Sequence, residues 1–328
     1  MTRKLHARVR FKRSVPFIVT PFVVHSLFAI CRDAWLRWFD LDDLVRNSQE
    51  NKKTAIILTL GAVSPKEDVF DVAQDRLHRL SAQILFDDLK HYSSQYHCVI
   101  VYEDAFREWF GVWKGLDLVP TSREMEKLAY GPAFDKFSGI YGAPVKPAAI
   151  RWLAESKISF RSAWILEPDI VLAKEPWHSL FEKYDKNDSD LIAFNVTFRH
   201  KDKHRWNHWK GCSFCRGLAK ASMQAGLLPA FRVSQRLAKE MFNALKSSRT
   251  SAHHEVFIPT FTTMHDFVWT DLAPEVGYVE WRPIIDMRFL SSMNESDVKS
   301  GALYHPIKSP RIFQKFIDVN RSHSHGST

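Results

Sequence analysis

Thr54-Ala-Ile-Ile-Leu-Thr-Leu60-Gly61 is the stretch of sequence that decides the fold. A short apolar run that ends at a glycine is typical of a strand buried on both faces, as strands of parallel sheets are. Apolar residues then recur at helical spacing over 72–93, and a second apolar, β-branched run follows over 98–102. Strand, helix and strand in this order predict a βαβ unit.

The same alternation continues toward the C-terminus. It predicts one α/β domain over 54–310, Rossmann-like, with a mostly parallel sheet flanked by helices. Residues 34–53 are predicted to be a stem, and 311–328 a C-terminal tail. Further strands are predicted over 116–119, 162–166 and 190–194, and further helices over 122–128, from Pro147 to Glu155, over 234–247 and over 254–262.

The net charge of +9 is concentrated at the N-terminus, where six basic residues stand between Arg3 and Arg13 without an acidic one. A nucleic-acid-binding protein more often carries its basic stripe on the folded part, so no nucleic-acid partner is expected. The sequence also has no G-x-G-x-x-G and no P-loop. NAD and ATP would therefore lack their phosphate cradle.

Residues 14–31 follow the basic run and carry no charge. A basic flank before an apolar stretch is the order of a signal anchor, which predicts a single-pass type II protein of the Golgi or ER membrane with a lumenal domain. Pro16 and Pro21 weaken the span, and the alternative is a segment packed on a cytoplasmic domain. Three sequons, at Asn187, Asn195 and Asn294, are compatible with the lumen.

The most informative motif is Trp164-Ile-Leu-Glu167-Pro-Asp169-Ile-Val-Leu172, in which an apolar run leads into two acids. Side chains at i and i+2 of an extended chain lie on the same side, and ligands of open α/β sheets bind beyond the carboxyl ends of the strands. Glu167 and Asp169 therefore predict a site for Mn²⁺ or Mg²⁺. The alternative is a pair of loop acids that caps the following helix.

Two further motifs contain groups able to bind or react. Lys146 and Arg151 lie in the helix that precedes the acidic pair, where they can contact the phosphate or the nucleobase of a nucleotide. Ala252-His253-His254-Glu255 follows a polar break and begins a short apolar helix. An acid in the first turn is favoured by the helix dipole, so Glu255 is equally compatible with a purely structural role.

The acidic pair resembles the D-x-D motif of glycosyltransferases of the GT-A type, with Glu167 in place of the first Asp. The resemblance extends over most of residues 54–308. It includes 232–237, His253-His-Glu-Val-Phe-Ile-Pro-Thr260 and Tyr304-His-Pro-Ile-Lys308, which are similar to segments of an uncharacterised group of these enzymes.

This resemblance implies a hexosyl- or pentosyltransferase that uses a UDP- or GDP-sugar as donor and a glycan or glycoconjugate as acceptor. It implies that Asp169, Glu167 and His305 bind the metal, with Glu167 facing the metal or the ribose. Lys308, together with Lys146, would bind the diphosphate of the donor. The alternative for His305 and Lys308 is a surface turn ahead of the tail.

In inverting members of this class a carboxylate at a helix start deprotonates the acceptor hydroxyl. The resemblance therefore makes Glu255 the candidate base and His254 the next candidate. Two other classes of protein stay open: a metal-dependent hydrolase, and a non-catalytic carbohydrate-binding protein of the same fold.

Cys212 and Cys215 form a C-x-x-C pair. With His204 and His208 upstream, the spacing H-x3-H-x3-C-x2-C permits a zinc site. We favour the alternative that the two cysteines are a buried thiol pair or form one disulfide in an oxidising lumen.

Overall fold

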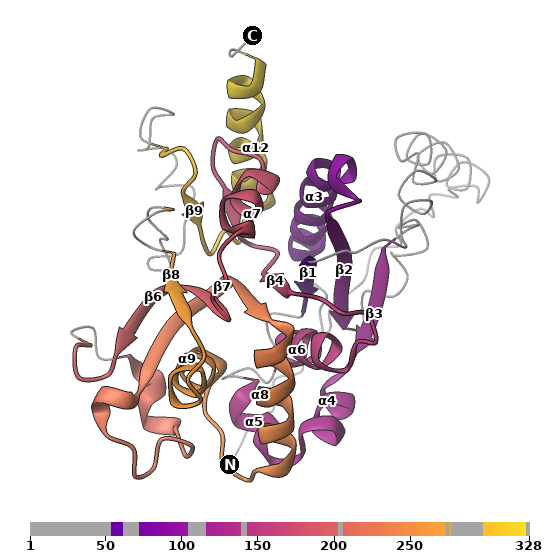
Figure 1. Cartoon of the computed structure of the whole chain (residues 1–328). Helices are drawn as coiled ribbons and strands as arrows, with labels where there is room; N and C mark the ends of the chain where they lie inside the picture. The colour runs from indigo at the N-terminus through magenta and orange to yellow at the C-terminus, as the bar shows by residue number, and fades with distance from the viewer. Residues whose placement is uncertain are drawn as a thin grey trace, which may run out of the picture. The chain divides into compact units, whose positions relative to one another are not determined.

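The computed structural model describes residues 54–61, 72–103, 116–138, 143–202, 206–272, 276 and 298–325 (Figure 1). The chain divides into two units, Met1–Asp43 and Leu44–Thr328, and all described residues belong to the second. The predicted signal anchor and the stem lie outside the described residues. Among the helices in the described part of the chain, none is long and apolar enough to cross a membrane.

Within the described residues, seven strands form one mixed sheet in the order β3-β2-β1-β4-β7-β6-β8. Four of its six strand pairs are parallel, and β7 alone runs antiparallel to both neighbours. The predicted α/β class with a mostly parallel sheet is confirmed. The strands are β1 (Thr54–Leu60), β2 (Tyr96–Glu103), β3 (Asp117–Thr121), β4 (Ser162–Leu166), β6 (Leu191–Phe198), β7 (Gln224–Ser234) and β8 (Trp269–Asp271).

Helices cover both faces of this sheet (Figure 1). Ala163 and Ile165 of β4 belong to the core cluster shared with α6, α8 and α9, whereas the Trp164 ring packs against Phe181 of α7 at 5.5 Å. This alternation is the two-residue period of a strand buried on both faces. The longer helices are α3 (Val72–Leu89), α4 (Arg123–Tyr130), α6 (Val145–Glu155), α7 (Trp177–Asp185), α8 (Gln235–Ser247), α9 (His254–Met264) and α12 (Pro310–His325).

Most predicted bounds differ from the observed ones by a few residues, and two differences affect the interpretation of the sequence. Helix α6 begins at Val145, so Pro147 stands inside the first turn, where the N–H that proline lacks would have no partner in the helix. The predicted tail is wrong for most of its length, because Pro310–His325 form helix α12. Its residues Ile312, Phe313 and Phe316 are buried in a cluster with Leu77 of α3.

A second, two-stranded sheet joins distant parts of the chain. In it β5 (Val171–Leu172) pairs antiparallel with β9 (Leu303–Tyr304). The N–H of Ile307 also donates to the carbonyl of Asp169 at 2.9 Å. These backbone bonds place residues 303–308 beside the segment that leaves β4.

Candidate metal and diphosphate site

The acidic pair begins where β4 ends, at the carboxyl edge of the sheet. The Glu167 N–H donates to the carbonyl of Pro229 in β7 at 2.8 Å, and the Thr59 hydroxyl donates to the carbonyl of Leu166 at 2.9 Å. These bonds fix the backbone at the last residue of β4 and at the residue that follows it. Pro168 and Asp169 then form a turn rather than an extended chain.

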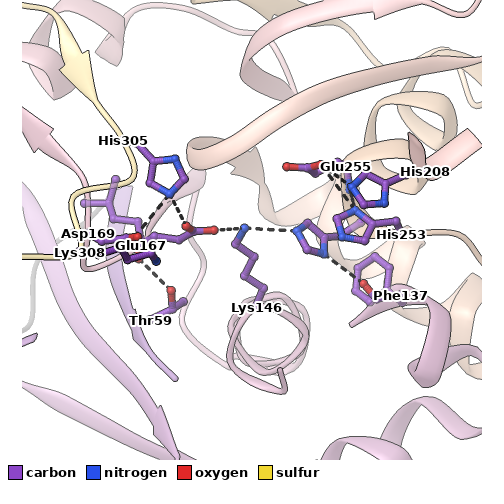
Figure 2. Close-up of polar contacts among 12 residues, drawn as sticks. Thr59, Phe137, Lys146, Glu167, Asp169, His208, His253, Glu255, His305 and Lys308 are labelled. Atoms are coloured by element: carbon purple, nitrogen blue, oxygen red, sulfur yellow. Dashed lines mark hydrogen bonds and ion pairs between the residues drawn. The ribbon is translucent and has the colours of Figure 1, made fainter. Parts of the chain in front are cut away.

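In this turn both carboxylates face one imidazole (Figure 2). His305 Nε2 lies 2.8 Å from Glu167 Oε2 and 3.5 Å from Asp169 Oδ1. One ligand atom from each of the three side chains lies within 4.8 Å of the others. The structure thus brings together the three predicted metal ligands, two from the end of β4 and one from the segment after β9.

Two lysines flank the acids. Lys146 Nζ forms an ion pair with Glu167, and Lys308 Nζ forms one with Asp169. Lys146 stands in the first turn of α6, where the helix dipole disfavours a cation, so its partner must come from outside the helix. Glu167 is that partner.

The charges at this site shift one another's pKa. Burial alone would raise the pKa of Glu167, but Lys146 and His305 outweigh it and lower the value to about 2. Burial is likewise outweighed at Asp169, whose pKa falls well below its usual range beside His305 and Lys308. For His305 burial acts in the opposite direction, yet the two carboxylates raise its pKa to about 9. Both acids are therefore ionised at neutral pH.

The donor atoms fit a divalent ion. Two carboxylate oxygens and one imidazole nitrogen suit Mn²⁺ well, and hard carboxylates also suit Mg²⁺. A site with only these three protein ligands leaves room for the phosphate oxygens that complete such ions in nucleotide sites.

A second cluster lies at the start of α9, on the other side of Lys146 in Figure 2. The rings of His208 and His253 stack at 3.7 Å with an angle of 7°. His208 Nε2 lies 3.5 Å and His253 Nδ1 3.7 Å from Glu255 Oε2. Burial raises the pKa of Glu255 to about 7, although Lys146 acts against it. A carboxyl group with this pKa can take up a proton near neutral pH.

His253 and His254 are both neutral at physiological pH. Burial, followed by His208 and Lys146, lowers the pKa of His253 to about 3. Its Nδ1 accepts a hydrogen bond from the Glu255 N–H at 3.3 Å, which caps α9. His254 is buried as well, and its pKa lies well below the usual value, mainly because of burial.

His254 and Lys146 connect the two clusters. His254 Nδ1 lies 3.2 Å from the carbonyl of Phe137, and Nε2 lies 3.2 Å from Lys146 Nζ. A carbonyl oxygen only accepts, so Nδ1 carries the proton and Nε2 accepts from the ammonium group. The Nε2 lone pair of His254, which a general base would use, already accepts a hydrogen bond from Lys146. Glu255 is therefore the better candidate for the base.

The loop that carries His208 is fastened to the segment before α9. Cys212 and Cys215 form a disulfide, so the alternative of a zinc site with these thiols is wrong. The N–H of Ser213 donates to the carbonyl of Ser251, and the N–H of Ser251 donates to the Ser213 hydroxyl, both at 3.0 Å. His204 lies outside the described residues.

Sequence reasoning missed two links in this site. The sequence spacing suggests His208 only as a zinc ligand, because its contact with Glu255 depends on a loop 47 positions earlier in the chain. The bond between Lys146 and His254 spans 108 positions and has no local pattern. The one available signal was a lysine at the start of a helix, where a cation is unfavourable.

No protein-family model matches this sequence, and no curated protein sequence does. Solved structures with a similar path of the chain include the galactosyltransferase LgtC in complex with donor and acceptor sugar analogues (10% identity, 82% of this chain and 95% of that one, TM-score 0.42). Mouse xyloside xylosyltransferase 1 is 12% identical over 77% of this chain and 96% of its own, with a TM-score of 0.40.

A third solved structure is 4-diphosphocytidyl-2C-methyl-D-erythritol synthase from Anaerococcus prevotii, which is 10% identical over 85% of this chain and 98% of its own, with a TM-score of 0.38. Two of these three structures carry the name of a glycosyltransferase.

Proposed function

We propose that this protein transfers a sugar from a nucleotide-diphosphate sugar to a hydroxyl group of a glycan or glycoconjugate, with the help of a divalent metal. The observation that carries the proposal is the convergence of Glu167, Asp169 and His305 at the carboxyl end of β4, with a lysine beside each acid. Three metal ligands and two cations in one place suit a diphosphate bound through a metal.

Each group at this site has a distinct task. Glu167, Asp169 and His305 would hold the ion, which when bound stabilises negative charge on the departing diphosphate. Lys308, whose side chain is 43% exposed, reaches the site from the solvent side and can contact a phosphate as a point charge. Lys146 approaches from α6 and adds a second positive charge.

Glu255 is the proposed base for the acceptor. It lies at the start of α9 next to His254, and Lys146 contacts both His254 and the metal ligand Glu167. An acceptor hydroxyl placed between the two clusters would lose its proton to the Glu255 carboxylate as its oxygen bonds to the sugar. A single displacement of this kind inverts the anomeric centre and needs no nucleophile from the protein.

Calorimetric titration of the full chain tests the proposal. UDP and GDP are titrated separately, with Mn²⁺, with Mg²⁺ and with a chelator. We expect one of the two nucleotides to bind in a metal-dependent way, because the diphosphate completes the coordination of the ion. Asp169→Asn is the matched variant, since it removes one ligand and changes the side-chain volume little.

The remaining classes give different results in the same experiment. A metal-dependent hydrolase binds the ion without any preference for nucleoside diphosphates. A non-catalytic carbohydrate-binding protein binds sugar without metal or nucleotide. Failure of both UDP and GDP to bind in the presence of Mn²⁺ and Mg²⁺ contradicts a nucleotide-sugar transferase.

A further inference from the structure

We propose that Lys146 and Lys308 act as built-in counter-cations of the metal site, so that a divalent ion binds tightly only together with the diphosphate that takes over these lysines. The inference rests on the proposed function and concerns the order and coupling of binding. It assigns the two lysines a role before any ligand arrives.

Without ligand, each acid of the site already has a cation. Lys146 contacts Glu167, and their side chains are only 12% and 24% exposed. Lys308 contacts Asp169, which is almost completely buried. Each carboxylate is therefore matched by an ammonium group before any ligand arrives, in addition to the His305 ring that faces both acids.

A divalent ion that binds without a nucleotide disrupts the ion pairs between the two carboxylates and the two lysines. It must separate each carboxylate from its lysine and leaves two ammonium groups near a doubly charged ion. In a partly buried site such repulsion is stronger than at the surface and is screened less by salt. The metal alone is therefore expected to bind weakly.

A diphosphate removes the conflict. Its phosphate oxygens bind the metal on one side and accept hydrogen bonds from lysines on the other. The negative charges of the diphosphate then replace those of Glu167 and Asp169 as partners of Lys146 and Lys308. Ion and diphosphate consequently favour each other's binding, and by linkage the two effects are equal.

His254 provides the second partner that this exchange requires. Its Nε2 accepts from Lys146, while its Nδ1–H is held by the carbonyl of Phe137. The bond to His254 can keep the ammonium group in the site when Glu167 turns to the metal. His254 is thus a positioning residue for Lys146.

The test is a binding cycle measured by calorimetry on the full chain. Mn²⁺ is titrated alone and with saturating UDP or GDP, whichever binds. In the wild type we expect the nucleotide to tighten Mn²⁺ binding at least about fivefold, at the lower end of typical coupling. Lys146→Gln should bind Mn²⁺ alone more tightly than the wild type and should lose most of the coupling.

Matched variants separate charge from structure. Lys146→Arg keeps the positive charge and should retain coupling, whereas Lys239→Gln removes an exposed lysine of α8 and should change nothing. His254→Leu should reduce the coupling, and His254→Gln, whose amide oxygen can accept from Lys146, should restore part of it. Near-ultraviolet circular dichroism shows whether Lys146→Gln folds. If it does not, Lys308→Gln replaces it, and this variant should likewise bind Mn²⁺ alone more tightly than the wild type and lose most of the coupling.

Three results overturn the inference. The first is that the wild type binds Mn²⁺ equally well with and without nucleotide. The second is that the folded Gln variants bind Mn²⁺ alone more weakly than the wild type. The third is that the coupling between Mn²⁺ and nucleotide is unchanged in these variants. If neither nucleotide binds with metal, the proposed function itself fails. If metal-dependent binding persists without any effect of the lysines, only the inference fails.

Discussion

Asp169 has a structural and a chemical task at the scale of a single residue. Its backbone carbonyl accepts from the Ile307 N–H, which fastens the C-terminal segment to the end of β4. Its carboxylate faces Lys308 and His305. Since the backbone bond does not involve the side chain, a change of the carboxylate alone separates the two tasks.

Asp169→Asn is expected to abolish metal-dependent nucleotide binding while the fold survives. The amide removes the charge that attracts the ion, and Lys308 is exposed enough to turn to water. Loss of groups that merely touch a metal ligand costs about 10–100-fold in affinity, so loss of a ligand should cost at least about 100-fold. Calorimetry measures the affinity, and a thermal melt checks the fold. Unchanged Mn²⁺ affinity would remove Asp169 from the site.

Glu255→Gln is expected to lower turnover by about 10²–10⁴-fold, the usual contribution of a general base. Donor affinity should barely change, because the proposed role of Glu255 concerns the acceptor. In the wild type, kcat/KM should rise as the pH rises through about 7, where the carboxyl group loses its proton and becomes a base. The variant should lack this rise.

Product analysis by NMR gives an independent check on Glu255. Direct displacement should give the inverted anomer. Retained configuration, or turnover near that of the wild type in Glu255→Gln, would leave Glu255 as the acid of a helix start.

Local spacing was sufficient for only part of this site. The proximity of Glu167 and Asp169 is predictable because both follow one buried strand, but the turn at Pro168 and Asp169 brings them together, and not the extended chain that the spacing assumes. Local spacing cannot predict that His305 lies beside Glu167, because 138 positions separate them. The sequence suggests His305 as a metal ligand only through the resemblance to GT-A glycosyltransferases. The stacking of His208 on His253 is a tertiary contact between residues 45 positions apart, which no local pattern predicts.

At the scale of elements, helix α12 packs against the segment that carries His305. Tyr304 immediately precedes His305, and its ring packs against Phe316 of α12 at 4.9 Å. Phe316 is almost completely buried in the cluster that joins α12 to α3. The position of His305 is thus connected to the packing of the last helix.

Phe316→Ala is expected to destabilise the protein by about 3–5 kcal/mol, the usual cost of removing a buried aromatic side chain. It should also weaken Mn²⁺ binding in the presence of nucleotide, because the Tyr304 ring loses its support beside His305. Urea unfolding measures the first effect and calorimetry the second. Lys315→Ala on the exposed side of α12 is the control and should stay within about 0.5 kcal/mol of the wild type.

The sequence predicts well the strands that have a clear apolar run, but it does not predict the strands that form only because they pair with a distant strand. The bounds of β1 and β4 agree with their apolar runs. Strand β7 was missed because it is buried almost throughout and contains Pro229, so it shows neither alternation nor an uninterrupted strand-like run. Strands β5 and β9 have two residues each and exist because they pair with each other.

At the scale of the whole molecule, we propose that residues 1–33 direct the chain to a membrane of the secretory pathway. The basic run and the uncharged stretch after it support this, and the Cys212–Cys215 disulfide is typical of an oxidising compartment. Residues 1–40 fused to a fluorescent reporter should give a Golgi or ER pattern. A diffuse cytosolic signal would contradict the proposal and favour a packed segment.

The distance along the chain between the two halves of the site has a consequence for synthesis. Glu167 and His305 are 138 positions apart, which a ribosome covers in about 7–28 s at about 5–20 residues per second. During this interval the acids at the end of β4 have emerged without the histidine and lysine that follow β9. Lys146 precedes both acids, so the nascent chain already contains a neutralising partner for Glu167 while translation continues.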